Sequence, residues 1–176
     1  MTRSPLPLAL ALSLAAACAP APDRAASDTP ATTGPATRGE PAPPLALRDR
    51  HGALVELASL RGKVVVVDFW ASWCAPCREA LPRLEGLSQA LAERGVVVIG
   101  VNVDSDRADA ERMLAELPVS FPVVFDEGRG VADRWAPPKM PSTFVIDQAG
   151  AVVYVQAGYA PGDEAALEAR IRELLP

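Results

Sequence analysis

Soft metal ligands are scarce in this chain of 176 residues, which contains one histidine and three cysteines. That number is too small for a closed zinc or iron–sulfur site on a single chain, so we expect no bound metal. Excess positive charge is also absent, because the formal net charge is -5 at pH 7. Nucleic-acid binding needs basic side chains that neutralise phosphates, so we expect no nucleic-acid partner.

A hydrophobic run long enough to cross a membrane is missing from the N-terminal region. The apolar run there covers residues 6–17, whereas a helix that spans a bilayer needs about 20 residues. A short apolar run behind Arg3 is typical of a secretory signal peptide, to which we assign residues 1–17. The run ends in small residues before Cys18, which resembles a bacterial lipobox. We expect cleavage before Cys18 and lipidation of its sulfur; ordinary cleavage that leaves a free thiol is the alternative.

Proline is concentrated at the N-terminal end, where 9 of the 18 prolines lie before residue 45. Residues 18–42 consist mainly of Ala, Pro, Thr, Ser, Gly and scattered charge, without an apolar period. Such a segment buries too little apolar surface to offset its ordering entropy, so we interpret it as a flexible tether. The remaining residues, 43–176, are expected to form one folded domain.

Apolar runs and amphipathic stretches alternate along this domain and predict an α/β fold. Two short strands around a turn open it, and the valine run at 64–69 predicts a central strand buried on both faces. Leucines spaced three and four apart predict a helix over residues 73–93, ended by Gly95. The other predicted elements are strands at 96–103, 121–125, 143–147 and 151–156, and helices at 108–117, 131–135 and 163–175.

The order of these elements indicates how they assemble. Strands separated by helices imply a central mixed, mostly parallel sheet flanked by helices. The turn at 148–150 joins the last two strands into a closing antiparallel hairpin, and a terminal helix follows. Asp163 is predicted to cap that helix at its N-terminus.

The segment Trp73-Cys74-Ala75-Pro76-Cys77 follows the valine strand and opens the predicted helix. Two cysteines at this spacing can close a disulfide, and the free N–H groups and the dipole of a helix N-terminus favour an anion. Thiolate is the attacking species in disulfide exchange. We therefore expect Cys74 to attack a substrate disulfide and the deeper Cys77 to resolve the mixed disulfide, without any other cofactor. Pro76 suits the first helical turn.

Two other interpretations of the cysteine pair stay open at this point. One is a permanent disulfide in a secreted domain, although a bridge that closes so small a loop stabilises little by chain entropy. The other is a metal-binding pair, which would need further ligands that the chain lacks.

Residues 67–78 resemble the active-site segment of thioredoxin. Residues 60–63 and 140–144 are similar to those of the TlpA/ResA-like family of the thioredoxin superfamily, and the resemblance covers roughly residues 43–176. It implies a thioredoxin-like fold and a bacterial extracytoplasmic thiol–disulfide oxidoreductase. It also implies a disulfide-containing protein substrate, a membrane thiol protein as electron donor, and a monomer held at the periplasmic side of a membrane by the lipid on Cys18.

The resemblance assigns roles to single residues. Asp68 matches the buried acid behind the thioredoxin motif and would transfer the proton of Cys77; desolvation in an apolar strand should raise its pKa. Pro141 matches the cis-proline that faces the dithiol, and Met140 before it would pair with an extended substrate peptide. The alternatives are a solvated strand aspartate and a trans loop proline. The remaining expected substrate contacts are Trp73, Ala75 and Pro76.

One position departs from the family pattern. Relatives often carry Glu three residues after the second cysteine, where this chain has Ala80, and Glu79 lies one position earlier. A shift of one residue turns a helical side chain by about 100°. Glu79 is therefore expected to point away from the dithiol.

Several functions are compatible with this fold. We favour a reductase of disulfides in secreted proteins or cytochrome c precursors, and an oxidase or isomerase remains the alternative because the sequence does not fix a redox potential. A peroxiredoxin-like peroxidase would need Thr three residues before the reactive cysteine, where this chain has Ala71. A copper chaperone would need a downstream histidine, and the single histidine, His51, lies upstream in a turn.

Overall fold

The valine run forms the central strand of a five-stranded sheet in the computed structural model, which describes residue 1 and residues 36–176. All seven residues of β3 (Val64–Trp70) are buried. β4 (Val96–Asn102) and β5 (Val123–Phe125) continue the sheet in parallel on one side of β3. On the other side, β6 (Ser142–Ile146) and β7 (Val152–Ala157) are added by antiparallel pairing. The order is β5-β4-β3-β6-β7.

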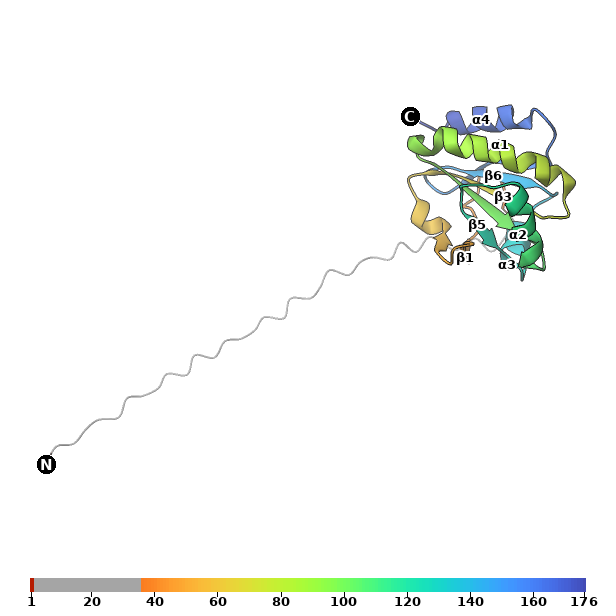
Figure 1. The fold of residues 1–176 in the computed structure, drawn as a ribbon. Helices are drawn as coiled ribbons and strands as arrows, with labels where there is room; N and C mark the ends of the chain where they lie inside the picture. Colours follow the sequence, from red (N-terminus) through yellow and green to blue (C-terminus); the bar gives the residue numbers. More distant parts are fainter. Residues whose placement is uncertain (2–35) are drawn as a thin grey trace. The chain divides into compact units, whose positions relative to one another are not determined.

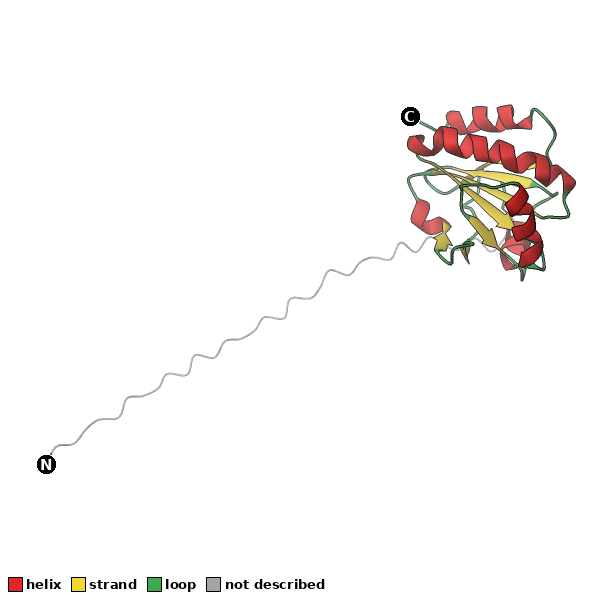
Figure 2. Ribbon diagram, viewed as in Figure 1, coloured by secondary structure: helices red, strands yellow, loops and turns green. Residues whose placement is uncertain are grey.

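Helices cover both faces of this sheet. α1 (Ala75–Leu91) continues into a short 3-10 turn and lies beside α4 (Asp163–Arg172) on one side (Figure 1). α2 (Arg107–Glu116) and α3 (Gly130–Trp135) lie on the other side (Figures 1 and 2). This is the α/β architecture with a mixed sheet that the sequence predicts. No helix in the described part of the chain is both long and apolar enough to cross a membrane.

The predicted N-terminal hairpin is present as a separate two-stranded sheet. β1 (Ala46–Arg48) and β2 (Leu54–Glu56) pair antiparallel, and a 3-10 turn over Leu57–Leu60 leads into β3. A backbone bridge between Asp49 and Val124 connects the hairpin to β5. The hairpin therefore lies next to the β5 end of the large sheet.

The ordered structure begins before residue 43, where the sequence alone places the start of the domain. Gly39 donates its backbone N–H to Val152, and Ala42 donates to Gly150, so residues 39–42 run alongside the start of β7. These residues are ordered by backbone hydrogen bonds, which an apolar pattern does not reveal. The predicted signal peptide, the lipidation at Cys18 and most of the predicted tether lie outside the described residues.

Alternating side chains divide the sheet into an aromatic face and a polar-containing face. Phe69 of β3, Phe144 of β6 and Trp135 of α3 are fully buried, with ring centroids 5.1 to 5.7 Å apart. Successive strand residues point to opposite faces. Asp68 and Thr143, which pair across β3 and β6, therefore lie on the face covered by α1 and α4.

The start of α4 differs from the prediction. Gly162, with a φ of 102°, is the N-cap residue, and no side chain caps the helix. The Asp163 carboxylate instead accepts the backbone N–H of Ala160 at 2.8 Å. The prediction that Asp163 caps this helix is wrong, because its side chain stabilises the preceding turn.

Candidate active site

The first helical turn of α1 presents the two cysteines. Cys74 is the N-cap residue, its Sγ accepts the backbone N–H of Cys77 at 3.2 Å, and the two sulfurs form a disulfide. Pro76 lies in the first turn, where its missing N–H leaves no hydrogen bond unmade. No acidic residue lies in that turn, so the positive end of the helix dipole faces the Cys74 sulfur without an opposing charge.

The surroundings of the two sulfurs are unequal. Cys77 is fully buried and Cys74 is 5% exposed. Ala75 and Pro76 are exposed, and Trp73 presents 65% of its surface to solvent. An exposed large apolar side chain next to the more accessible sulfur is the kind of surface that contacts another protein.

The Met140–Pro141 peptide bond is cis, as the resemblance to the thioredoxin superfamily implies. Pro141 is buried and Met140 is half-buried. Because Ser142 pairs with Phe69 in the antiparallel β3–β6 ladder, this bond lies at the end of β3 from which the chain leaves toward Cys74. The structure therefore brings the proline segment and the C-x-x-C turn, more than 60 residues apart in the chain, to one end of the sheet.

Asp68 is a buried carboxyl group with few partners. It is 1% exposed, and its Oδ1 accepts the hydroxyl of Thr143 at 2.7 Å. Its Oδ2 has no hydrogen-bond partner within the described residues. Burial raises the pKa of Asp68 from 3.8 to about 7, and the Thr143 hydrogen bond offsets only part of that rise. The group can therefore gain or lose a proton near neutral pH.

The sheet-facing side of α1 carries Cys77 and Ala80, which are one turn apart and both buried. Ala80 lines a pocket together with Thr143, the residue that holds Asp68. Glu79 is exposed on the opposite side of the helix. No carboxylate of α1 thus replaces the glutamate that related sequences carry at the position of Ala80.

A second buried acid holds the loop in front of Cys74. Asp104, 2% exposed, follows β4 and accepts the backbone N–H of Ser72 at 3.0 Å and its hydroxyl at 3.0 Å. The amide of Asn102 donates to the same carboxylate at 2.8 Å. These bonds fix the turn two residues before Cys74.

Sequence reasoning missed both Thr143 and Asp104. Each carries a signal in the sequence that could have been used. Thr143 is a polar residue at the start of an otherwise apolar strand, and Asp104 comes directly after a buried strand. Side chains at the carboxyl ends of parallel strands commonly gather at a functional site.

A disulfide at the start of a helix and a cis-proline at the same end of a sheet of this order are typical of the thiol–disulfide oxidoreductases of thioredoxin-like fold. The Redoxin family model matches residues 37–171, so the chain belongs to the Redoxin family. It is similar to the thiol–disulfide oxidoreductase ResA of Bacillus subtilis (strain 168), with 34% identity over 122 residues, which cover 69% of this chain and 68% of the relative. ResA of Halalkalibacterium halodurans is 35% identical over 123 residues, 70% of each chain.

Solved structures agree with this assignment. The crystal structure of a putative thiol:disulfide interchange protein DsbE from Chlorobium tepidum has a TM-score of 0.75 and 36% identity, and it covers 78% of this chain and 97% of that chain. The solution structure of a putative protein disulfide isomerase from Bacteroides thetaiotaomicron has a TM-score of 0.73 and 28% identity, covering 79% and 90%. The chain is thus a thioredoxin-like thiol–disulfide oxidoreductase.

Proposed function

We propose that this protein is an extracytoplasmic disulfide reductase in which Cys74 is the nucleophile. The observation that carries the proposal is the place of the Cys74 sulfur at the N-cap of α1, where it accepts the Cys77 N–H. A helix N-terminus with no acidic residue in its first turn stabilises thiolate over thiol. Burial of Cys77 leaves Cys74 as the sulfur that a substrate can reach.

The reaction uses two thiols and one proton carrier. The Cys74 thiolate attacks one sulfur of a substrate disulfide, forms a mixed disulfide and releases the first substrate thiolate. Asp68 then takes the proton of Cys77, and the Cys77 thiolate attacks Cys74 and releases the second substrate thiolate. Two electrons pass from the cysteine pair to the substrate, so the chemistry requires no cofactor beyond the disulfide.

Trp73 and Met140 form the surface that would receive the substrate. Trp73, Ala75 and Pro76 are exposed on the helix side of the disulfide, and Met140 and Pro141 approach from the start of β6. An extended peptide that carries a disulfide could pair with the backbone at Met140, as added strands do in peptide recognition. The proposed substrate is therefore a disulfide-containing protein, including cytochrome c precursors.

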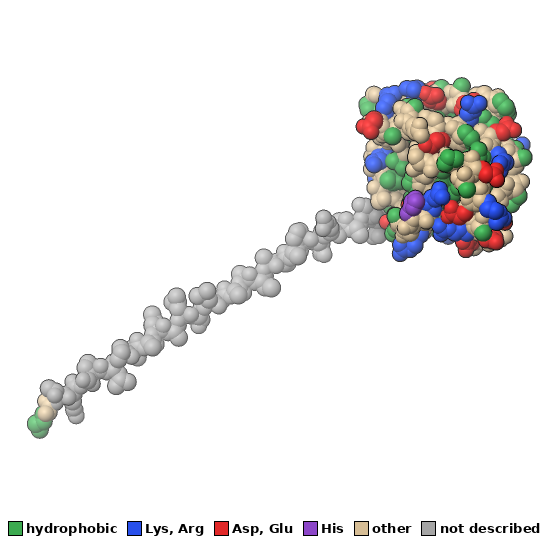
Figure 3. All heavy atoms as spheres, viewed as in Figure 1, with side chains coloured by type: hydrophobic (Ala, Val, Ile, Leu, Met, Phe, Trp, Pro, Cys, Tyr) green, Lys and Arg blue, Asp and Glu red, His purple; other side chains and the backbone are tan. Residues whose placement is uncertain are grey.

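The N-terminal region supports a place in the bacterial cell envelope. A short apolar run that ends at Cys18 suits export, cleavage and lipid attachment, and the tether would then hold a monomeric domain at the periplasmic side of a membrane. A membrane thiol protein would return electrons to the Cys74–Cys77 disulfide. Acidic and basic side chains are both present on the face shown in Figure 3.

Equilibration of the cysteine pair with glutathione and dithiothreitol buffers tests the direction of the reaction. We expect a potential near thioredoxin's value of about -270 mV, whereas a value near about -120 mV would identify an oxidant.

Alkylation of the reduced protein at mildly acidic pH should label Cys74 first. Equal labelling of both thiols in the native protein would contradict the assignment of Cys74 as nucleophile.

A further inference from the structure

The proposed cycle leaves a proton on Asp68. After Cys77 has attacked Cys74, the substrate leaves as a thiolate that takes a proton from solvent, and the proton taken from Cys77 remains on the carboxyl group. This proton either returns to Cys77 when an electron donor reduces the disulfide or, while the protein is oxidised, exchanges with solvent. With 1% of its surface exposed, Asp68 cannot pass the proton directly to bulk water.

Among residues 36–176, Thr143 is the hydrogen-bond partner of the Asp68 carboxyl group, and it also lines an opening in the surface. Its hydroxyl donates to Asp68 Oδ1 at 2.7 Å, and the same residue lines a pocket between α1, α4 and the β6–β7 hairpin. A hydroxyl has one proton to donate and two lone pairs that accept. When its O–H turns from Asp68 toward the pocket, Thr143 can accept the proton of Asp68 while it passes its own proton to a water molecule.

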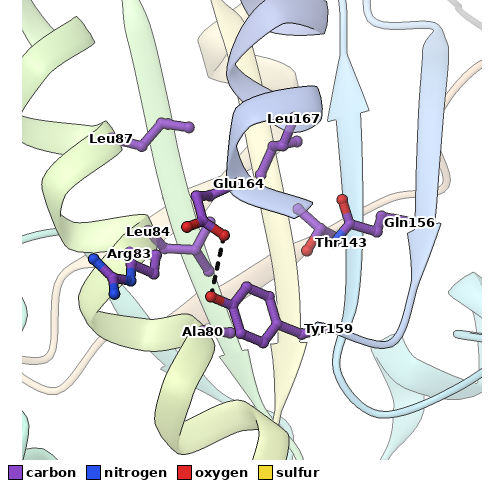
Figure 4. A pocket seen from close by; sticks show the side chains of 9 residues that line it. All are labelled: Ala80, Arg83, Leu84, Leu87, Thr143, Gln156, Tyr159, Glu164 and Leu167. Atoms are coloured by element: carbon purple, nitrogen blue, oxygen red, sulfur yellow. Dashed lines mark hydrogen bonds between the residues drawn. The ribbon is translucent and has the colours of Figure 1, made fainter. Parts of the chain in front are cut away.

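The pocket changes from apolar walls to a polar mouth. The enclosed part of the pocket is small, with room for about one water molecule. Figure 4 shows leucines of α1 and α4 on one side, with Thr143 and Gln156 on the other. At the mouth, the Tyr159 hydroxyl donates to Glu164 at 3.1 Å, and Arg83 lies close by (Figure 4). Polar groups of this kind can hold a water molecule between Thr143 and bulk solvent.

The charged side chains near this path lie at the mouth of the pocket and not beside Asp68. The pKa of the Glu164 carboxyl group is lowered by hydrogen bonds from two backbone N–H groups, its own and that of Gly162. The bond from Gly162 is 3.0 Å long. Arg83 supplies a positive charge beside Glu164 and Tyr159. No Lys, Arg or His forms an ion pair with Asp68 among residues 36–176.

We propose that the pocket between α1 and α4 is the proton exit of the enzyme, with the Thr143 hydroxyl as the relay between Asp68 and solvent. In each transfer, the Asp68 O–H bond breaks, Thr143 gains that proton, and the Thr143 O–H bond breaks toward water. Asp68 becomes a carboxylate, Thr143 remains a neutral hydroxyl, and the proton leaves through the mouth at Tyr159 and Glu164. This inference rests on the proposed role of Asp68.

Infrared spectroscopy of the oxidised protein tests the route without any substrate. At a pH of about 5, Asp68 is protonated and gives a carboxyl band that Asp68→Asn removes. After rapid mixing into D₂O, the shift of this band measures proton exchange with solvent. We expect Thr143→Val, which keeps the shape and removes the hydroxyl, to slow the exchange about tenfold or more, and Thr143→Ser to restore it.

Ala80→Leu gives a second test, because it fills the pocket and leaves the Asp68–Thr143 hydrogen bond in place. It should also slow the exchange. If the band shifts as fast in both the valine and the leucine variant as in the natural protein, the proton leaves elsewhere and the route is wrong.

Failure of the proposed function gives a different result. In that case Asp68→Asn would resolve the mixed disulfide at the natural rate in a single turnover, whatever the exchange data show.

Discussion

Two buried carboxyl groups, Asp68 on β3 and Asp104 just after the neighbouring strand β4, have different surroundings. Asp104 accepts hydrogen bonds from both donors of Ser72 and from the amide of Asn102. Asp68 accepts one hydrogen bond, from Thr143, and its second oxygen has none. The three hydrogen bonds to Asp104 fix the turn before Cys74, whereas burial with a single donor raises the pKa of Asp68 to about 7. The two acids therefore differ in the number of groups that hold them in place.

The pH dependence of stability gives the largest expected effect. The unfolded chain releases the Asp68 proton near pH 4, but the folded protein keeps it until about pH 7. The folded state therefore binds more protons in this window, and its stability falls as the pH rises. We expect the free energy of unfolding to fall by about 3 kcal/mol between about pH 5 and pH 8. Urea unfolding of the oxidised protein measures this loss.

Asp68→Asn is the control for that measurement, since it removes the titrating group and should flatten the profile. A natural protein that is equally stable at both ends of the window would show that Asp68 is ionised throughout, like an ordinary surface acid.

The rate of mixed-disulfide resolution is the next largest effect. Asp68→Asn removes the base that takes the Cys77 proton, and we expect resolution to slow by about a hundredfold near neutral pH. Single-turnover mixing of the reduced protein with a fluorescent disulfide measures the step. If the Asn variant keeps the natural rate from about pH 6 to pH 9, Asp68 is not the proton carrier.

Removing Asp104 should lower the stability of the protein and change the geometry of the loop that holds Cys74. Asp104→Ala leaves the Ser72 N–H without its partner, and we expect a loss of about 2 kcal/mol in the free energy of unfolding. The rate of Cys74 alkylation should change as well, because the loop before it is released.

Asp126→Ala is a matched control for Asp104→Ala. Asp126 is 4% exposed and accepts the backbone N–H groups of Val131 and Ala132 at the start of α3, away from the loop before Cys74. It should cost a similar free energy while leaving the alkylation rate of Cys74 unchanged. Equal changes of that rate in both variants would mean that Asp104 acts only through general stability.

Glu79→Gln should have the smallest effect. The side chain is exposed on the side of α1 that faces away from the sheet, so we expect stability to change by less than about 0.5 kcal/mol. Disulfide reduction should proceed at the natural rate. A clear loss of activity in a standard insulin reduction assay would show that Glu79 serves the dithiol after all.

The elements of the fold and the cysteine pair follow from short-range patterns. The valine run, the leucine spacing behind Cys77 and the residues around Pro141 each carry their signal within a few positions, and the structure agrees with them. The C-x-x-C motif can likewise be interpreted from its position between a buried strand and a helix alone.

The partners of the two acids could not be predicted in this way. Asp68 and Thr143 are 75 residues apart, and Ser72 and Asp104 are 32 apart, so both contacts depend on how strands pair. Register between distant strands is set by packing of the whole sheet and not by local sequence. The prediction of the α4 cap was wrong for a related reason. The Asp163 carboxylate accepts the backbone N–H of Ala160 in the preceding turn instead of an N–H of the helix.

The ordered segment at residues 39–42 has a consequence for handling this protein. It pairs with the start of β7, which is the outermost strand of the sheet on its side. An uncovered outer strand exposes backbone groups that can join another copy and start aggregation. Pro41, which has no N–H, limits further pairing at that border. A shortened chain that begins at residue 43 would therefore lose a protective cover and should self-associate more readily than one that begins at residue 36.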